Sequence, residues 1–384
     1  MPDQRRVAVT AEMNRNGFAA IMHCMLVHLP LFLLLKVAPM LVRQMLSLLA
    51  ALILNSALMA QDTTNFPVIG HVDRFDPQLN QLLADDAHIE VLCSGFDWAE
   101  GPVWVPDASV RTGGYILFSD IPPNSVMKWQ EGIGVSLFMK PSGYTGVADY
   151  GREPGSNGLA LDAAGRLISC EHGDRRISAL TPGGGKITLA SHWNGKRFNS
   201  PNDLAIHNNG DIYFTDPIYG LPQRENDPMR EIDFCGVYRL QPDGTVTLQS
   251  QEISRPNGIA FSPDQKTLYV ANSDGNDPIW RAFPVGDDGN LGKPASFFDA
   301  AKEPRLPRGG GDGLKVDQQG NVFATGPGGV LVLSPQGKLL GRIVTGERIA
   351  NVGWGDDGST LYLTSDMYLC RIRTQTRGAG WGDR

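Results

Sequence analysis

The sequence predicts an all-β fold, a six-bladed β-propeller with four-stranded antiparallel blades around a central metal-binding channel. Three observations lead to this prediction. A hairpin pattern recurs in six copies between residues 100 and 366. Glycine and proline together supply 71 of 384 residues (45 + 26), which suits a turn-rich β protein. Long helical periodicity is absent after residue 90.

Each copy of the pattern begins with a polar residue, usually followed by glycine. An apolar strand comes next, then a turn rich in Asp and Gly, and then a second strand, which is the pattern of a β-hairpin. The segment "NDLAIHNNGDIYFTDP" from Asn202 onward shows all these parts. The copies start 57, 45, 55, 55 and 39 residues apart, at Glu100, Asn157, Asn202, Asn257, Asp312 and Asn351.

Further short strands lie between the copies, so that each repeat holds four strands. They include "SVMKWQ", "RISALT", "GVYRLQPDGTVTLQ", "IWRAFPV" and "GVLVLSPQGKLLGRIV". Four strands in a repeat of about 40 to 50 residues is the period of a propeller blade. A β-sandwich is the alternative fold, but it would not explain six hairpins in the same register.

The chain divides by composition into four segments. We expect residues 1–60 to be an N-terminal extension with a secretory signal, and residues 61–88 to be a lead-in. Residues 89–373 are expected to form the propeller, and residues 374–384 a C-terminal tail.

The N-terminal extension contains two apolar runs, Ile21–Leu35 and Met45–Leu54. The second follows Arg43 and ends in small residues, as a secretory signal does, with cleavage expected after Ala60. The native start is interpreted as Met40 or Met45, with the earlier residues an over-extended reading frame. Neither run reaches the roughly 18 apolar residues of a membrane span. We therefore expect an exported protein, periplasmic or secreted, without stable membrane insertion after cleavage; an uncleaved membrane anchor is the alternative.

The charge and the cysteines limit the partners and the cofactors. The net charge is −7 and basic residues do not cluster after residue 60, so nucleic acid is not an expected partner. The mature chain would keep four cysteines, whose spacing matches no zinc pattern. Cys93 lies in the first strand and Cys370 in the last strand of the propeller. Both should therefore lie near the seam of the ring, where the N-terminal strand is expected to complete the last blade, as a disulfide or as two free thiols.

The polar residues that start the six copies predict a cation site. In a propeller the innermost strand of each blade runs along the channel, so equivalent side chains would gather at one end of it. Carboxylate and amide oxygens are the ligands of hard cations. The alternative is that Asn and Asp merely cap the start of each strand. This alternative is at least as strong for Asn157 and Asn351, and weaker for Glu100, because Glu is a poor turn residue.

Four motifs resemble the gluconolactonase/regucalcin family. They are "AEGPVW" (99–104), "RFNSPNDLAI" (197–206), "PNGIAFSPD" (256–264) and "GDGLKVD" (311–317). Two further segments, "CEHGDRRI" (170–177) and "YFTDPIYGL" (213–221), are similar to the bacterial gluconolactonase branch. The resemblance covers about residues 89–372 and implies a six-bladed propeller hydrolase with a divalent metal in the channel.

The resemblance also implies roles for particular residues. The family's metal ligands fall on Glu100, Asn202, Asn257 and Asp312, which are four of the six positions that the repeats select. Ca²⁺ is the expected cation, with Zn²⁺ as the alternative. Asn157 is then expected to line the site or to bind substrate.

The attack of water on a lactone needs a group that removes a proton. Asp203, next to Asn202, is the first candidate for this base and His172 is the second. Asp203 could instead only orient a ligand, and His172 could be a polar lining residue. Arg197 and Tyr219 are assigned to substrate binding. Arg197, Arg224, Arg230 and Arg308 lie in segments that could reach the channel mouth, where one or more could contact a sugar hydroxyl or carboxylate. For each arginine taken singly, a solvated loop side chain is the simpler interpretation.

The expected activity is metal-dependent hydrolysis of a sugar lactone, such as gluconolactone, to the aldonic acid. A divalent cation would polarise the lactone carbonyl. No "GxSxG" motif occurs, which disfavours a serine nucleophile. The alternatives are a propeller that binds a ligand or protein around a structural cation without catalysis, and a phosphotriester hydrolase on the same scaffold, which would need a more hydrophobic channel.

Overall fold

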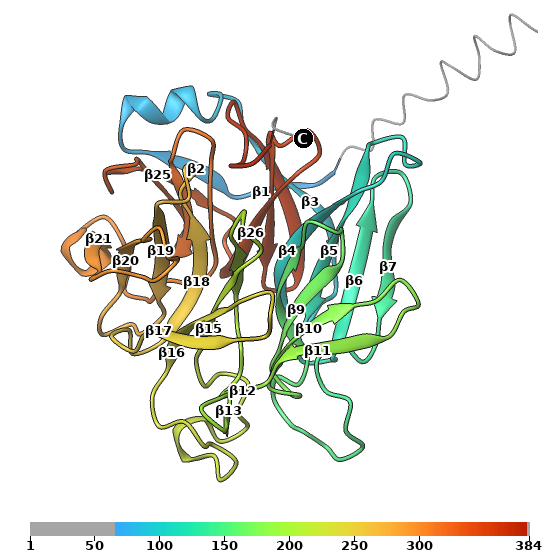
Figure 1. The fold of residues 1–384 in the computed structure, drawn as a ribbon. Coiled ribbons are helices and arrows are strands. Elements are labelled where there is room, and N and C mark those ends of the chain that lie inside the picture. Colours follow the sequence, from blue (N-terminus) through green and yellow to red (C-terminus); the bar gives the residue numbers. More distant parts are fainter. Residues whose placement is uncertain (1–65, 382–384) are drawn as a thin grey trace, which may run out of the picture. The chain divides into compact units, whose positions relative to one another are not determined.

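The structure, a computed structural model, describes residues 66–381, which form a six-bladed β-propeller and confirm the predicted fold (Figure 1). Blades 1 to 6 are numbered from the first inner strand along the chain. Blade 1 contains β4 (Ala99–Pro106), β5 (Gly114–Asp120), β6 (Ser125–Gln130) and β7 (Gly134–Met139); blade 2 contains β8 (Ser156–Leu161), β9 (Leu167–Glu171), β10 (Arg176–Leu180) and β11 (Lys186–Ala190); blade 3 contains β14 (Leu204–Ile206), β15 (Ile212–Asp216), β16 (Gly236–Leu240) and β17 (Val246–Ser250).

The second half of the ring repeats this order. Blade 4 contains β18 (Pro256–Phe261), β19 (Thr267–Asn272), β20 (Ile279–Pro284) and β21 (Ala295–Asp299); blade 5 contains β22 (Leu314–Val316), β23 (Val322–Gly326), β24 (Gly329–Leu333) and β25 (Leu339–Val344); blade 6 contains β26 (Ile349–Gly355), β27 (Thr360–Ser365), β28 (Tyr368–Arg373) and β3 (Ile89–Ser94). A small hairpin, β12 (His192–Trp193) and β13 (Lys196–Arg197), lies between blades 2 and 3 in the chain. Each blade begins on its inner strand, and the inner strands of successive blades contact one another around the ring.

The ring closes through the N-terminal part of the chain, as the sequence predicts. Strand β3 pairs antiparallel with β28, so that segments far apart in sequence share blade 6. Cys93 lies opposite Leu369, and a register shift separates Leu369 from Cys370. The Cys93 side chain therefore packs with Leu369 against blade 1, whereas Cys370 packs in the core towards blade 5. Both thiols are free.

Residues 66–88 do more than lead into the propeller. Strand β1 (Val68–Ile69) adds a fifth strand to blade 6 outside β3, and β2 (His71–Arg74) adds one to blade 5. The short 3₁₀ helix η1 (Pro77–Gln81) then places Leu79 in the core between these blades. At the other terminus, the Gln375 amide donates to the Leu82 carbonyl at 2.8 Å. Both ends of the described chain thus cover the seam of the ring.

Six hydrophobic clusters fill the spaces between neighbouring blades, one cluster for each pair. Aromatic rings provide much of this packing. Trp280 is fully buried between blades 4 and 5. Phe214 and Tyr238 stack at 5.5 Å in the cluster between blades 2 and 3. A side chain of this size removes about 150–250 Å² of surface from water, so the rings contribute strongly to blade packing.

Glycine next to the polar residue lets neighbouring inner strands approach closely. A Cβ atom on Gly101, which has φ +54°, would lie 2.2 Å from the Asn157 carbonyl oxygen of the next blade. A Cβ atom on Gly258 would lie equally close, 2.2 Å, to the Asp312 carbonyl oxygen. The repeated polar-glycine pair therefore has a packing cause at the axis, where the blades are closest together.

Candidate functional site

The six residues that start the repeats all lie at the inner strands, at the end where each strand begins. Glu100, Asn157, Asn257 and Asn351 lie in β4, β8, β18 and β26, and Asn202 and Asp312 lie two residues before β14 and β22. None of the six is more than 6% exposed. We call these six residues the polar ring.

Local irregularities turn the polar ring towards the axis. In blades 1, 2 and 4 the pairing of the two inner strands shifts register at the ring residue: between Glu100 and Val103, between Ser156 and Leu159, and between Pro256 and Ile259. Blade 6 has the same shift between Ile349 and Asn351. Bulges of this kind redirect side chains and are common beside active sites.

Three carboxylates from alternate blades face one another in the channel: Glu100, Asp203 and Asp312. Burial raises the pKa of all three, and the charge of Asp203 raises the pKa of Glu100 and of Asp312 further. The pKa of Asp312 rises to about 6, although Arg348 opposes the shift. A concentration of negative charge in a buried channel is unfavourable unless a cation or protons balance it.

The amides of the polar ring supply neutral oxygens beside these carboxylates. The side-chain oxygens of Asn157 and Asn202 are buried without a hydrogen-bond partner among the described residues. Buried acceptors are normally satisfied, so unpartnered ones call for an explanation such as a bound ion. Among the described residues, no three or more His, Cys, Asp or Glu side chains lie close enough together to hold a metal ion by themselves. A cation here would therefore need the amide oxygens together with the carboxylates.

Asp203 occupies the position that holds glycine in four of the other copies. Its carboxylate accepts the Leu204 amide at 2.9 Å and the Asn351 side-chain amide at 3.4 Å. The Lys315 ammonium lies 3.9 Å away. The structure thus places Asp203 inside the channel beside the polar ring, where its raised pKa suits a group that takes up a proton.

His172 lies behind the polar ring and is completely buried. Its Nε2 is 3.5 Å from the Asn157 side-chain nitrogen, and its Nδ1 is 3.7 Å from a Glu153 carboxylate oxygen. Burial lowers the pKa of His172 to about 4, so its imidazole is neutral at pH 7. This environment suits a residue that positions Asn157 better than one that accepts a proton from water.

The two residues assigned to substrate binding lie in different surroundings. The Tyr219 hydroxyl forms a hydrogen bond with the Ser273 hydroxyl at 2.5 Å. Burial raises the pKa of Tyr219, and the charge of Asp312 raises it further. Tyr219 therefore lies close to the channel. The Arg197 guanidinium instead donates to the Asp174 carbonyl at 2.7 Å, and no described contact joins it to the polar ring.

Sequence reasoning gave no role to Glu153 or Arg348. An oxygen of Asp312 lies 3.1 Å from the Arg348 guanidinium, which is largely exposed above it. A usable signal for Arg348 was present, because it precedes the ring residue Asn351 by three positions and so must lie at the mouth of the channel. Glu153 offers no such signal, since it lies in a long loop outside the repeats.

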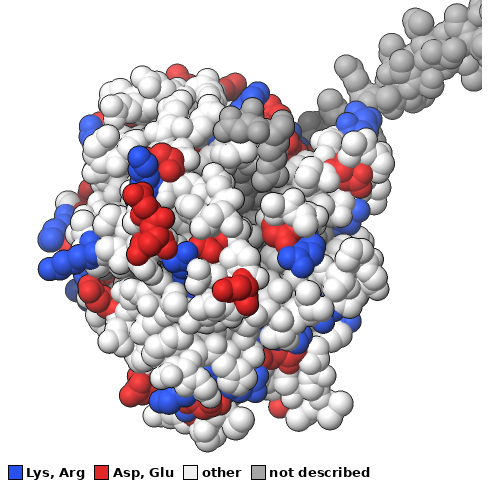
Figure 2. Space-filling view, in the orientation of Figure 1, with Lys and Arg blue, Asp and Glu red and all other residues white. Residues whose placement is uncertain are grey.

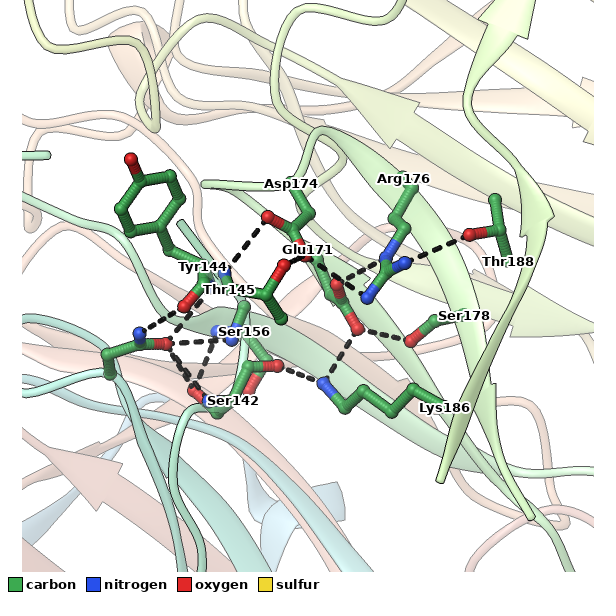
Figure 3. A network of polar contacts seen from close by, with 12 residues as sticks. Ser142, Tyr144, Thr145, Ser156, Glu171, Asp174, Arg176, Ser178, Lys186 and Thr188 are labelled. Carbon is green, nitrogen blue, oxygen red and sulfur yellow. Dashed lines mark hydrogen bonds and ion pairs between the residues drawn. The ribbon is translucent and has the colours of Figure 1, made fainter. Parts of the chain in front are cut away.

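That loop, residues 141–155, is fastened to blade 2 by a buried ionic network (Figure 3). Glu171, fully buried in β9, pairs with Arg176 and Lys186 at 2.6 Å each. Lys186 also donates to the Ser142 carbonyl, and Asp174 accepts the Thr145 amide at 3.0 Å. The network therefore holds the loop that carries Glu153 in place near His172.

A cavity of about 870 Å³ lies away from this site, between blades 2 and 3. Its walls include Leu161 and Ile206, the last residues of β8 and β14. It thus opens at the opposite end of the inner strands from the polar ring. The one carboxylate among the described residues in its walls, Asp162, is paired with Arg166 at 2.7 Å, so the cavity lacks the group of carboxylates that lies at the polar ring.

The surface carries charges of both signs. On the face shown in Figure 2, described Lys and Arg side chains are interspersed with Asp and Glu. This pattern fits the net charge of −7 and does not resemble the basic footprint of a nucleic-acid-binding protein. No helix among residues 66–381 has the length and hydropathy needed to cross a membrane.

Fold and site together define a six-bladed propeller with a buried ring of carboxylates and amides at one end of its channel. Comparison with known proteins agrees with this class. Residues 98–367 match the family described as SMP-30/Gluconolactonase/LRE-like region. A curated gluconolactonase of Zymomonas mobilis is 39% identical over 343 residues, which are 85% of this chain and 93% of the relative. The chain therefore belongs to the SMP-30/gluconolactonase/LRE-like family.

Solved structures extend the comparison. A gluconolactonase of Xanthomonas campestris has a TM-score of 0.68 and 31% identity, over 80% of this chain and 97% of that chain. A calcium-binding protein, regucalcin, of Agrobacterium tumefaciens has a TM-score of 0.58 at 19% identity, over 76% of this chain and 94% of that chain. The second likeness shows the fold alone. The family resemblance predicted from the motifs is thus confirmed.

Proposed function

We propose that this chain hydrolyses a sugar lactone, such as gluconolactone, to the aldonic acid with the help of a divalent cation in the channel. The observation that supports this proposal most strongly is the group of carboxylates Glu100, Asp203 and Asp312 at one end of the propeller channel. Two amide oxygens without hydrogen-bond partners among the described residues, those of Asn157 and Asn202, lie beside this group. The relatives from Zymomonas and Xanthomonas, at 39% and 31% identity, are both gluconolactonases by name. The enzyme class is therefore a lactonase, a carboxylic-ester hydrolase.

Glu100, Asn202, Asn257 and Asp312 would hold the cation. Two carboxylates and two amides form an all-oxygen set, which suits Ca²⁺ better than Zn²⁺ because zinc sites usually include His or Cys. The unpartnered oxygen of Asn202 and the mutual repulsion of the carboxylates fit such a group. When bound, the cation would act as a Lewis acid on the lactone carbonyl.

Asp203 would remove the proton from the attacking water. The Asn351 amide and the Lys315 ammonium fix its carboxylate in the channel, so its orientation does not depend on substrate. Its raised pKa brings its basicity closer to neutral pH than that of an ordinary aspartate. His172 would act through Asn157, by holding that amide in its orientation towards the substrate.

Substrate hydroxyl groups would meet Asn157 and Tyr219. Asn157 has a free side-chain oxygen at the polar ring, and Tyr219 carries a hydroxyl close to Asp312. Arg197 stays a prediction for the outer part of the site, since its guanidinium is held at the Asp174 carbonyl.

Lactone turnover before and after chelation tests the proposal. Hydrolysis of δ-gluconolactone would be followed by proton release and compared with the spontaneous rate. We expect activity that EDTA removes and that Ca²⁺ restores. A rate no faster than spontaneous hydrolysis in the presence of Ca²⁺, Zn²⁺, Mn²⁺ or Mg²⁺ would contradict the proposal.

We also propose export across a membrane, with cleavage after Ala60. The support is the sequence pattern of the second apolar run, which lies outside the described residues. N-terminal sequencing of the protein recovered from a Gram-negative host should begin at Gln61. Recovery of the intact N-terminus in the membrane fraction would instead establish the anchored form.

A further inference from the structure

A cationic side chain lies over the mouth of the channel. The Arg348 guanidinium is 3.1 Å from an Asp312 carboxylate oxygen and stacks over the Trp98 ring at 5.2 Å. Asp312 is almost fully buried, whereas the Arg348 side chain is 67% exposed. Arg348 therefore lies at the boundary between the polar ring and solvent.

The guanidinium of Arg348 has unused hydrogen-bonding capacity. A guanidinium carries five N–H donors, and among the described residues Arg348 has one acceptor, the Asp312 oxygen. Arg342, by comparison, gives two donors to Asp73, at 3.0 and 2.7 Å. The remaining donors of Arg348 are free for an anion that enters the channel mouth, and planar donors of this kind fit a carboxylate.

A second guanidinium approaches the same region. Arg224 lies over the Tyr219 ring at 5.7 Å, and its Nε is buried without an acceptor among residues 66–381. Its backbone has φ +50°, an unfavourable conformation for arginine that the surrounding loop maintains. Burial raises the pKa of Glu153, and the positive charges of Arg224 and Arg348 oppose the rise. Arg224, over Tyr219, and Arg348, beside Asp312, therefore lie on the same side of the propeller as Glu153.

We propose that Arg348, with Arg224, forms a carboxylate-binding site above the polar ring, which holds the carboxylate of the ring-opened product. This inference rests on the proposed lactonase function. The lactone is neutral at its reacting carbonyl. Hydrolysis adds the water oxygen to the carbonyl carbon, breaks the ring C–O bond, protonates the ring oxygen, and releases one proton to give a carboxylate. Arg348 gains an anionic partner in addition to Asp312 only at that stage, so it discriminates product from substrate.

Direct binding of D-gluconate tests the site without any need for turnover. Calorimetric titration in the presence of Ca²⁺ would compare wild type with Arg348→Gln and Arg348→Lys. Losing a charge-assisted hydrogen bond should weaken gluconate binding about tenfold or more in Arg348→Gln. Arg348→Lys should recover part of the loss, because it keeps the charge but not the planar donors. D-glucitol, which lacks the carboxylate, should bind equally to all variants.

Arg305 offers a matched control. It also pairs with a carboxylate, Glu303 at 2.6 Å, and lies over an aromatic ring, Phe75 at 4.5 Å. Phe75 directly follows β2, which is the outermost strand of blade 5, whereas the channel is lined by β22 at the opposite edge of that blade. Arg305→Gln should bind gluconate like the wild type. A loss in this variant as large as that in Arg348→Gln would overturn a specific role for Arg348.

Two further measurements separate the outcomes. Metal content measured by mass spectrometry should not fall in Arg348→Gln, because removing Arg348 frees the Asp312 charge. Gluconate binding within twofold of wild type in Arg348→Gln, or wild-type binding no tighter for gluconate than for glucitol, would overturn the proposal. If δ-gluconolactone is not hydrolysed while gluconate binding still depends on Arg348, the carboxylate site stands and the proposed function fails.

Discussion

The side-chain amide of Asn351 donates to the carboxylate of Asp203 over 3.4 Å, and this contact joins blade 6 to blade 3 across the channel. The two blades lie opposite each other in the ring of six. Gly158 makes room for this arrangement, since a Cβ atom there would lie 2.6 Å from the Asp203 carboxylate. The centre of the propeller is therefore bridged by side chains, and Asp203 is fixed at that centre.

We predict that Asp203→Asn folds normally and keeps its cation, but that its kcat for lactone hydrolysis falls about 100-fold or more. The amide preserves the shape and the contact with Asn351, whereas it cannot take up the proton of the attacking water. Stopped-flow or pH-stat kinetics, together with the thermal shift caused by Ca²⁺, would measure both properties. An unchanged kcat would move the role of base away from Asp203, and Glu153 would be the next residue to test.

Removal of a ligand carboxylate should weaken cation binding, and the loss of lactone hydrolysis should follow from that. For Glu100→Gln and Asp312→Asn we predict a Ca²⁺ affinity lower by roughly a hundredfold, because ligand charge sets the strength of such sites. Activity should be lost at low Ca²⁺ and should return in part at high Ca²⁺. Calcium titration followed by calorimetry would measure the affinity.

Asp317→Asn is the matched control for this experiment. Asp317 is a fully buried carboxylate five residues after Asp312, bonded to Asn321 at 2.8 Å and to Thr376 at 2.9 Å. The substitution should lower the melting temperature and leave Ca²⁺ affinity unchanged. Equal losses of affinity in Asp317→Asn and Asp312→Asn would show that general destabilisation, and not ligation, explains the effect.

The blade architecture could be predicted because each repeat carries its own local signals. A polar residue, an alternating apolar strand and an Asp-Gly turn specify a hairpin without reference to the rest of the chain. Closure through β3 followed from the position of the first strand. The outer strands β1 and β2 could not be predicted, because they contain two and four residues and depend on pairing with β3 and β25.

The polar ring could also be predicted, because the repeat fixes one position per blade. The loops that reach the polar ring do not follow the repeat. Glu153 reaches the mouth through the tertiary packing of residues 141–155 and carries no local pattern. Arg348 reaches the mouth in the turn before β26, and its only sequence signal is its place three positions before the ring residue Asn351. The neutral state of His172 likewise results from complete burial, which a sequence of this kind does not reveal.

His172 should make stability depend on pH. Its pKa is about 4 in the folded protein, because burial disfavours the charged form, and about 6.5 when unfolded. Between these values the unfolded chain binds the extra proton, so the free energy of unfolding falls as pH falls. The contribution approaches about 1.4 kcal/mol per pH unit. We predict a shallower slope between pH 6.5 and 4 for His172→Gln in urea titrations, and an equal slope in both proteins would contradict this.

The thiols at the seam should be free and unreactive in the native protein. Cys93 and Cys370 lie on adjacent strands, but the register places Cys93 opposite Leu369, so the two side chains enter different hydrophobic clusters. A disulfide would require one of the two side chains to leave its cluster. Burial also raises the pKa of each thiol to about 12, so that the reactive thiolate is scarce at neutral pH.

Mass spectrometry of the non-reduced, trypsin-digested protein should therefore show no peptide linking Cys93 to Cys370. Alkylation with iodoacetamide should label neither residue until denaturant opens the seam between β3 and β28. Strand β3, which precedes blade 1 in the chain, closes the ring by pairing with β28 in blade 6. The onset of labelling should therefore coincide with loss of the closed ring, as measured by tryptophan fluorescence. A linked peptide from protein exported to an oxidising compartment would show instead that the seam rearranges enough to bring the two sulfurs together.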